Sequence, residues 1–481
     1  MNTLVALKPR ALRALVLFGV LAVAAVPAYA ATITIVNINA AGVGFNDTTP
    51  RTPIGGNPGT TLGAQRLYIF NYAAAIWGSV LPSNVTIVVS AQFAGQTCTA
   101  TSATLGSSGA STIHRDFTGA PFTGTWYNQA LANKLSGSDL APANPDMNST
   151  FNSSIDNGCF GPGFTWYYGV DGNEPATGIE LLPVLLHEMG HGLGFQTQTS
   201  TNGTYSSGFP TAFDHFLLNK TTGLHWSEGG DTTAARTARR NSAIALNQLV
   251  WDGPNSVAFA ATFLGGQAQV FVNSPAGIAG MKTAQDATFG ATLTTVGLTG
   301  VVVQALDPAD VAGPTTFDAC EPLTNAAAVS GKIALVDRGT CTFVAKALNV
   351  QAAGAIGMIV GNNAATGLPG MGGTDPTITI PCVGISQPDA TAIRSNLPGV
   401  NATIGRSSTV KAGADTSYRA LMYTPNPVVA GSSVSHWDIS LTPNALMEPN
   451  INNDLHLSLD LTLTVMRDIG WFRTNKTVGA K

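Results

Sequence analysis

Hydrophobic and polar positions alternate in the first third of the chain in a way that predicts a mixed sheet. Residues 33–36 and 85–89 are short runs rich in β-branched side chains, which is typical of strands. Between them, residues 62–77 carry apolar side chains at helical spacing. This strand–helix–strand order predicts a helix packed on a sheet. Residues 141–173 are dense in Asn, Gly, Pro and Ser, and we expect a loop there.

A second apolar pattern fills residues 270–411 and predicts a separate folding unit. The pattern predicts buried strands within 331–339, 355–360 and 380–385, and helices over 343–353 and from residue 387 onward. Because these segments supply an apolar core of their own, the region is expected to fold as an α/β unit.

The C-terminal segment, residues 412–481, shows no clear core of its own. We therefore expect it to pack on another part of the chain. It contains a predicted helix over residues 458–468, with Ser458 placed as the N-cap.

Residues 1–30 have the pattern of a secretory signal peptide. Three basic side chains precede an apolar run over residues 14–26, and Ala28-Tyr29-Ala30 has the small-x-small pattern of a cleavage site. The apolar run is shorter than the ~20 residues that span a bilayer. We expect a secreted, extracellular protein without a stable membrane anchor after cleavage.

Composition excludes some classes of partner. Only 10% of the residues are charged, and the net charge is −4. The longest basic run, residues 236–240, is typical of a solvated helix face. Nucleic-acid binders carry basic clusters, so nucleic acid is not an expected partner.

The five cysteines include no CxxC pair, which excludes a zinc ribbon or a thioredoxin-like site. In an exported chain they are expected to form disulfides. We pair Cys320 with Cys341, which flank the first predicted strand of the second region, and Cys98 with Cys159 in the N-terminal half. Cys382 is left over and is expected to be a buried apolar residue in its strand.

The strongest chemical signal lies in residues 185–195, which read LLHEMGHGLGF. On a helix, His187 and His191 project from one face, as two nitrogen ligands of one Zn²⁺ require. Glu188 lies beside them, where it can take a proton from metal-bound water. We expect the helix to begin near Glu180 and to end at Gly194 with positive φ.

A catalytic zinc site needs a third protein ligand. Asp214, His215 and Glu228 lie downstream of the helix at short sequence distance. His436 lies much further away, within Ser-His-Trp-Asp and shortly before Asn-Ala-Leu-Met-Glu-Pro. Sequence distance alone does not decide among them, because a self-folding insert can leave its ends close together.

The combination of these three segments resembles the leishmanolysin-like branch of the metzincin metallopeptidases. The resemblance implies one catalytic Zn²⁺ held by His187, His191 and His436, with Glu188 as general base and Met447 in an apolar Met-turn beneath the metal. The compact metzincin pattern would place its third ligand at position 197, which is Thr197 here. The form with a long insertion is the one that fits.

Residues 270–411 resemble a protease-associated (PA) domain, through segments 331–339, 351–355 and 380–383. Together the two resemblances imply an α+β protein. Its metzincin-like catalytic domain, with a mixed sheet, an active-site helix and a C-terminal subdomain, is interrupted by an α/β PA domain. The expected parts are residues 1–30 (signal peptide), 31–200 (N-terminal subdomain), 201–269 (linking segment), 270–411 (PA domain) and 412–481 (C-terminal subdomain).

The sequence thus predicts a secreted zinc endopeptidase that acts on proteins or peptides. Two other functions compete with it. One is a non-catalytic extracellular binding or adhesion protein with a structural zinc, although such a site has no need of Glu188. The other is a zinc hydrolase acting on a non-peptide amide or ester.

Overall fold

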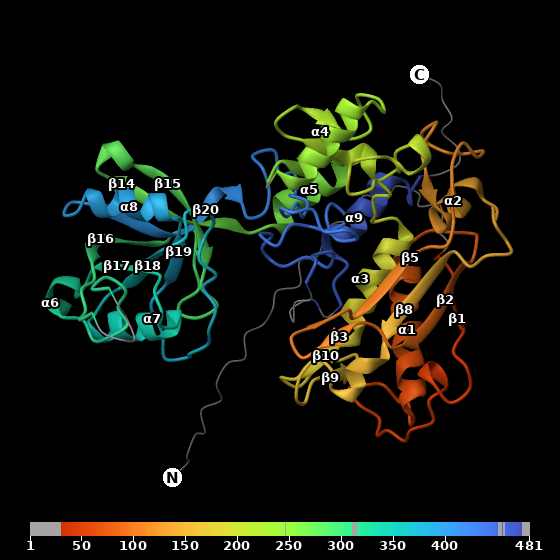
Figure 1. Ribbon diagram of the computed structural model, residues 1–481, viewed down its shortest axis with the longest axis horizontal. Helices are drawn as coiled ribbons and strands as arrows, with labels where there is room; N and C mark the ends of the chain where they lie inside the picture. The colour runs from red at the N-terminus through yellow and green to blue at the C-terminus, as the bar shows by residue number, and fades with distance from the viewer. Residues whose placement is uncertain (1–29, 246, 310–314, 451–454, 456, 474–481) are drawn as a thin grey trace, which may run out of the picture.

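The computed structural model describes residues 30–245, 247–309, 315–450, 455 and 457–473. The predicted signal peptide, apart from Ala30, lies outside them. The chain forms two bodies: a larger one of residues 30–264 and 412–473, and a smaller barrel (Figure 1). Among the described residues, no helix is long and apolar enough to cross a membrane.

The larger body is built on a four-stranded sheet in the order β1-β2-β8-β5. Strands β1 (Ile33–Asn37), β2 (Ile87–Ala94) and β8 (Met147–Asn152) are parallel, and the edge strand β5 (Gly106–Ala110) is antiparallel to β8. Helices α1 (Leu62–Val80) and α3 (Leu181–Leu193) pack on the sheet and on each other. The Trp77 indole of α1 donates to the Leu186 carbonyl of α3 across 3.1 Å, which ties the two helices together.

Strand β8 corrects the expectation of a loop over residues 141–173. Its sequence, MNSTFN, is polar at several positions that a buried strand usually fills with apolar side chains. The strand is central, so its backbone pairs with β2 on one side and β5 on the other. Met147 and Phe151 supply its contact with the core.

The remaining elements of the larger body are short or lie around the sheet. They are β3 (Cys98–Thr99), β4 (Ser102–Ala103), β6 (Ile113–His114), β7 (Tyr127–Asn128), α2 (Gln129–Ser136), β9 (Thr165–Tyr167), β10 (Gly178–Glu180), β11 (Leu217–Asn219), β12 (Leu224–His225), α4 (Thr233–Ile244), β13 (Leu249–Trp251), α5 (Pro254–Phe263) and α9 (Asp460–Ile469).

Residues 201–264 are more than the linking segment expected from the sequence. Phe213, Trp226 and Trp251 are buried in the same apolar cluster as α3. The C-terminal segment joins this cluster too, as expected for a segment without a core of its own. Its helix α9 begins at Asp460 after Leu459, so the prediction that Ser458 caps it is wrong.

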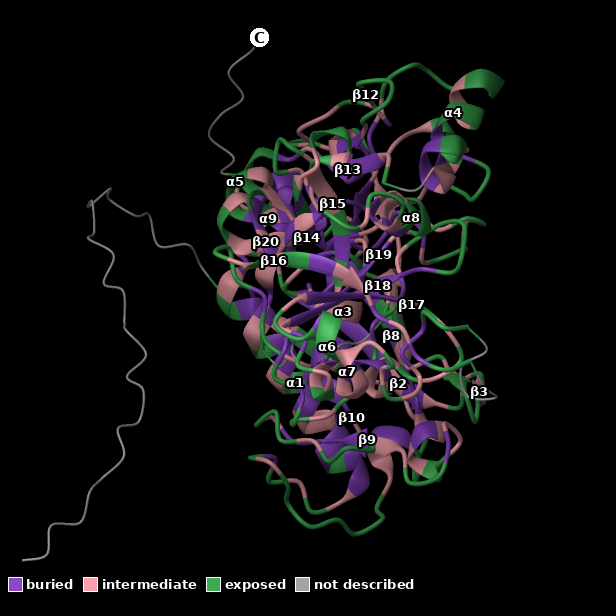
Figure 2. Ribbon diagram, turned by 90° about the vertical axis from the view of Figure 1, so that its left-hand side faces the viewer, coloured by how far each residue is buried: buried purple, intermediate pink, exposed green. Residues whose placement is uncertain are grey.

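The smaller body is a closed barrel. Its strands are β14 (Gly266–Ser274), β15 (Gly280–Asp286), β16 (Leu298–Gln304), β17 (Ile333–Asp337), β18 (Gly357–Gly361), β19 (Cys382–Ile385) and β20 (Asn401–Lys411), and its helices are α6 (Ala326–Val329), α7 (Phe343–Ala352) and α8 (Gln387–Ser395). Strands β17 and β18 are almost entirely buried (Figure 2), and the barrel's apolar clusters are separate from that of the larger body. Gly266 pairs with Lys411, so the barrel leaves the larger body and returns to it at one place.

Two disulfides brace the chain, with the pairings expected from the sequence. Cys98 is bonded to Cys159 in the larger body, and Cys320 to Cys341 in the barrel. Cys382 is a free, buried cysteine in β19, and burial raises the pKa of its thiol to about 12. A thiol held protonated in this way is unreactive.

Candidate metal centre

Helix α3 is an almost fully buried platform for two histidines. Five apolar side chains and Pro183 fill its first two turns, where proline is tolerated because the first backbone N–H groups have no helical partner. The helix begins after Glu180 and ends before Gly194, whose φ of 125° only glycine adopts readily. Both ends lie where the sequence predicted them. His187 and His191 are one turn apart on the helix.

The structure brings His436 to the same point from a distant part of the chain. The Nε2 atom of His187 lies 3.2 Å from Nε2 of His191 and 3.2 Å from Nε2 of His436. The three rings therefore converge on one spot through the same kind of atom. Among the described residues, these histidines form one of two clusters of side chains that could hold a metal ion.

The opposite nitrogen of each ring contacts a backbone carbonyl. Nδ1 of His187 lies 2.6 Å from the oxygen of Leu446 and Nδ1 of His191 lies 2.8 Å from that of Phe195. Nδ1 of His436 lies 2.7 Å from the oxygen of Ser432. A carbonyl can only accept, so each Nδ1 carries the proton and each Nε2 presents a lone pair to the shared centre.

This donor set fits a zinc ion. Two nitrogens bound to one Zn²⁺ at about 2.0–2.1 Å in tetrahedral geometry lie about 3.3 Å apart. The observed separations of 3.2 Å agree with that spacing. Burial lowers the pKa of His187 to about 4 and that of His436 to about 3, so the rings are neutral at physiological pH. Neutral imidazole is the form that binds a metal.

Glu188 follows His187 on α3 and borders the same space. It is half-buried, and the backbone N–H of Ser108 in the edge strand β5 hydrogen-bonds its carboxylate. Burial raises the pKa of Glu188 to about 7, against the smaller lowering effect of that hydrogen bond. The contact with β5 was not foreseen from the sequence, because it depends on how an antiparallel strand lies over the helix.

Met447 packs against α3 at Gly190, the residue before His191. It is fully buried, and its Sδ atom would be 2.9 Å from a Cβ added to Gly190, so the absence of a side chain at Gly190 lets the thioether approach the helix. The neighbouring Leu446 supplies the carbonyl that orients His187. The Leu446 N–H in turn donates to Asp460 at 2.5 Å, a support that the sequence gave no reason to expect.

The nearer candidates for a third ligand are engaged elsewhere. Asp214 is fully buried and accepts hydrogen bonds from Thr197 Oγ1 at 2.6 Å and from the Thr211 N–H at 2.8 Å. Nε2 of His215 is 2.9 Å from the hydroxyl oxygen of Thr125. Glu228 accepts from the His225 N–H at 2.7 Å.

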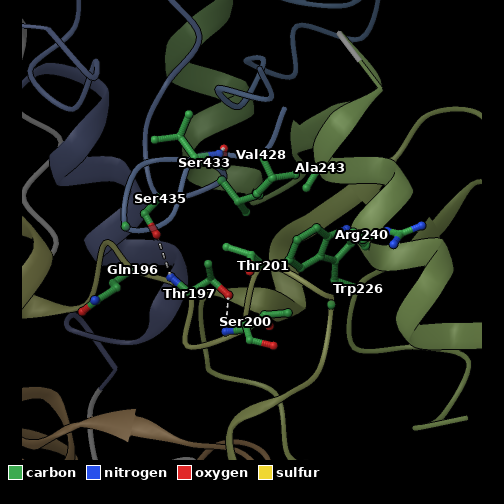
Figure 3. A pocket seen from close by; sticks show the side chains of 15 residues that line it. Gln196, Thr197, Ser200, Thr201, Trp226, Arg240, Ala243, Val428, Ser433 and Ser435 are labelled. Carbon is green, nitrogen blue, oxygen red and sulfur yellow. Dashed lines mark hydrogen bonds between the residues drawn. The ribbon is translucent and has the colours of Figure 1, made fainter. Parts of the chain in front are cut away.

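Position 197 has a structural role instead. The Thr197 N–H donates to the hydroxyl of Ser435, the residue before His436, at 3.3 Å (Figure 3). These two residues line a pocket of about 70 Å³ whose lining includes none of the three histidines. A space of this size holds a few water molecules, not a substrate. The contact joins the end of α3 to the segment that carries the distant histidine.

A much larger groove opens in front of the histidines. It has a volume of about 690 Å³ and is lined by the residues before and in β5, by β10, by the first turns of α3 and by the segment around Leu446. His187, Glu188 and His436 form part of its wall. The candidate metal site is therefore accessible to a molecule of peptide size.

A family model and two curated proteins match parts of the chain. The PA domain model matches residues 298–393, so the chain contains a PA domain. ER degradation-enhancing alpha-mannosidase-like protein 3 is 54% identical over 50 residues in Xenopus laevis and 56% identical over 50 residues in Homo sapiens. The match is 10% of this chain, and it spans only 6% and 5% of the length of these relatives.

Several solved structures overlap with about a third of the chain. BSAP, a zinc aminopeptidase from Bacillus subtilis, is 25% identical with a TM-score of 0.22, covering 33% of this chain and 38% of that one. A peptidase M28 precursor from Shewanella amazonensis is 20% identical with a TM-score of 0.22, covering 30% and 35%. The subtilisin-like protease Apa1 from an Antarctic Pseudoalteromonas is 18% identical with a TM-score of 0.22, covering 31% and 34%. Overlaps at these TM-scores define no common overall fold.

Proposed function

We propose that this protein is a secreted zinc endopeptidase of the metzincin type. His187, His191 and His436 would hold a single Zn²⁺, and Glu188 is the general base. The observation that carries the proposal is the convergence of three Nε2 atoms at 3.2 Å spacing, with the Glu188 carboxylate beside them in the wall of a wide groove. The two disulfides are consistent with an oxidising, extracellular location.

The chemistry divides between the metal and Glu188. A zinc ion bound here supplies Lewis acidity toward a carbonyl oxygen and lowers the pKa of a water molecule to about 7. Glu188 takes the proton from the attacking water and later delivers it to the leaving amine. Its hydrogen bond from the Ser108 backbone fixes the carboxylate on the groove side of the helix. A structural zinc site would need no such residue.

The position of the edge strand β5 beside the groove favours a peptide as the substrate. Strand β5 pairs with β8 on one side only, and residues 103–106, which lead into it, line the groove. An extended peptide can add to such an edge through backbone hydrogen bonds. Because backbone pairing requires no free terminus, this arrangement favours cleavage within a chain.

The deciding experiment combines zinc analysis with two kinds of substrate. The purified mature protein should hold one equivalent of zinc and cleave a quenched peptide that is blocked at both ends. Removal of zinc with 1,10-phenanthroline should abolish cleavage, and added Zn²⁺ should restore it. Hydrolysis of aminoacyl anilides alone would indicate an aminopeptidase instead. Hydrolysis of simple esters without peptide cleavage would favour a non-peptide hydrolase, and tightly held zinc with no hydrolysis would favour a binding protein.

A further inference from the structure

A second cluster of metal-binding side chains lies in the PA domain, far along the chain from the histidines. Asp307, Asp318 and Glu321 follow β16, and their carboxylate oxygens lie within 4.8 Å of one another. The cluster adjoins the disulfide between Cys320 and Cys341. Neither the proposed hydrolysis nor the PA family match assigns it a role.

The two aspartates are buried and are held in place by the chain around them. Asp318, which is 1% exposed, accepts hydrogen bonds from the Thr315 hydroxyl at 2.8 Å and from the Cys320 N–H at 3.3 Å. One oxygen of Asp307, Oδ2, accepts from the Glu321 N–H at 3.3 Å. The carboxylates are therefore fixed in orientation rather than free to turn to solvent.

The second oxygen of Asp307 has no such partner. Asp307 is 3% exposed, and its Oδ1 atom is buried without any hydrogen bond from the described residues. A buried carboxylate oxygen without a donor costs several kcal/mol of desolvation, and such an atom in a folded protein calls for an unseen partner. That observation is independent of the clustering of the acids.

The charge balance points the same way. Lys346 of α7 is fully buried beside the cluster, with its Nζ donating to the Asp318 backbone carbonyl at 2.6 Å. This ammonium group faces Asp307, Asp318 and Glu321 together, so acidic side chains outnumber the lysine at the cluster.

We propose that Asp307, Asp318 and Glu321 bind a calcium ion. An all-oxygen ligand set is typical of hard cations. Ca²⁺ tolerates irregular arrangements of such oxygens, whereas Mg²⁺ demands near-ideal octahedral geometry, so carboxylates that are fixed by the surrounding chain favour calcium. Glu321 is half-buried, which gives the ion a path from solvent and room for water ligands.

The ion would cross-link the loop after β16 to the disulfide and, through Asp318, to α7. Extracellular modules commonly bind Ca²⁺ with dissociation constants of about 10⁻⁴–10⁻³ M. The PA domain would then be at least half loaded at millimolar calcium and mostly empty at micromolar calcium. Its thermal stability therefore depends on calcium, independently of the zinc in the larger body.

The test measures ⁴⁵Ca²⁺ binding to the full-length protein by equilibrium dialysis, after zinc loading and removal of excess zinc. The wild-type protein should bind at least half an equivalent at 1–2 mM free Ca²⁺ and saturate at one equivalent, and its unfolding midpoint should rise with calcium. Asp307→Asn should weaken binding at least tenfold and abolish the rise. Asp375→Asn is the matched control, because Asp375 is a partly exposed acid of the same domain whose partner is Thr377 in its own turn.

Two results would overturn the proposal. One is wild-type protein that binds no calcium at 2 mM, in which case the carboxylates serve only to neutralise Lys346. The other is Asp307→Asn protein that binds calcium as the wild type does. If near-ultraviolet circular dichroism shows that Asp307→Asn is unfolded, Glu321→Gln at the half-buried edge of the cluster replaces it, with the same expected loss.

Discussion

Each histidine of the metal centre uses its two ring nitrogens for different tasks. Nε2 faces the shared centre, and Nδ1 meets a backbone carbonyl of Leu446, Phe195 or Ser432. Because these supports come from the backbone, side-chain substitutions nearby leave them intact. Changes at the ligands themselves, or at Glu188, should therefore have the sharpest effects.

Glu188→Gln should retain one equivalent of zinc and the native fold but lose at least a hundredfold in kcat/KM for peptide cleavage, since general acid–base catalysis contributes about 10²–10⁴-fold. Zinc content and cleavage of a blocked peptide are measured on the same preparation. Glu228→Gln, an identical change at an acid bonded to the His225 N–H, should behave like the wild type. Near-normal activity of Glu188→Gln would rule out its role as the base.

His436→Ala should sharply weaken zinc binding and abolish hydrolysis, because two histidines remain where three converge. His215→Ala serves as the comparison. Its ring is stacked on Phe122 with 4.3 Å between centroids and lies away from the cluster, so zinc stoichiometry should stay at one. The readout is zinc retained after dialysis against a weak chelator. One tightly held equivalent in His436→Ala would mean that another residue is the third ligand.

Two of the three proposed zinc ligands could be predicted from local sequence spacing. The spacing of His187 and His191 is a local property of a helix, so it could be read directly. The third ligand could not be selected from spacing, because Asp214 and His215 are nearer in sequence than His436. In the structure, the Asp214 carboxylate accepts hydrogen bonds from Thr197, Thr199 and Thr211. Two of these threonines are about 15 residues away in the chain, so spacing alone does not reveal the arrangement.

At the scale of elements, the ends of the helices are joined by single side chains. Asp468 of α9 accepts hydrogen bonds from the N–H groups of Asn255 and Ser256 at the start of α5, and from the Trp251 indole at 3.0 Å. Trp471 donates to the Leu193 carbonyl at the end of α3 across 2.9 Å. These contacts dock the C-terminal segment on the zinc helix.

Asp468→Ala should lower the free energy of unfolding by about 3 kcal/mol, because it leaves several buried N–H and O–H donors without an acceptor. Urea unfolding of the zinc-loaded protein provides the measurement. Asp375→Ala, at a partly exposed acid that accepts hydrogen bonds from Thr377 in its own turn, should lower the free energy by about 1 kcal/mol or less. Equal stabilities for the two variants would show that α5 does not depend on this cap.

Local sequence patterns predicted the long elements better than the central strand. Helix α1 and helix α3 follow from apolar periodicity and from the glycine after α3. Strand β8 was missed because its polar residues Asn148, Ser149 and Thr150 are placed in a strand by pairing with β2 and β5, not by their own propensity. Such pairing involves residues about 40–60 positions away, which no local pattern contains.

At the scale of the molecule, the barrel and the larger body have separate cores and meet where Gly266 pairs with Lys411. Replacing residues 267–410 with three glycines should leave a folded larger body that still binds one equivalent of zinc. Replacing residues 201–264 in the same way should not, because Phe213 and Trp251 belong to its core. Zinc content and near-ultraviolet circular dichroism distinguish the two outcomes, and loss of zinc on removal of the barrel would contradict the separation.

The buried strands of the barrel could be predicted from the chain, but the closure of the barrel could not. Strands β17, β18 and β19 are apolar runs that stand out in the sequence. Strand β20, which closes the barrel against β14 and β16, reads NATIGRSSTVK and resembles a loop. Its partner β14 lies more than a hundred residues earlier.

The adjacent ends of the barrel also bear on how the metal centre assembles during folding. His187 and His436 are 249 residues apart in the chain. Once the barrel has folded, roughly 100 residues remain as flexible chain between them, and since closure entropy grows as (3/2)RT ln n, this shortening saves only about 0.8 kcal/mol. The number of residues in the inserted barrel therefore has almost no effect on the entropy cost of bringing His187 and His436 together. An ancestor could have gained, lost or exchanged a domain here while its histidines continued to meet, provided that the ends of the newcomer lay side by side.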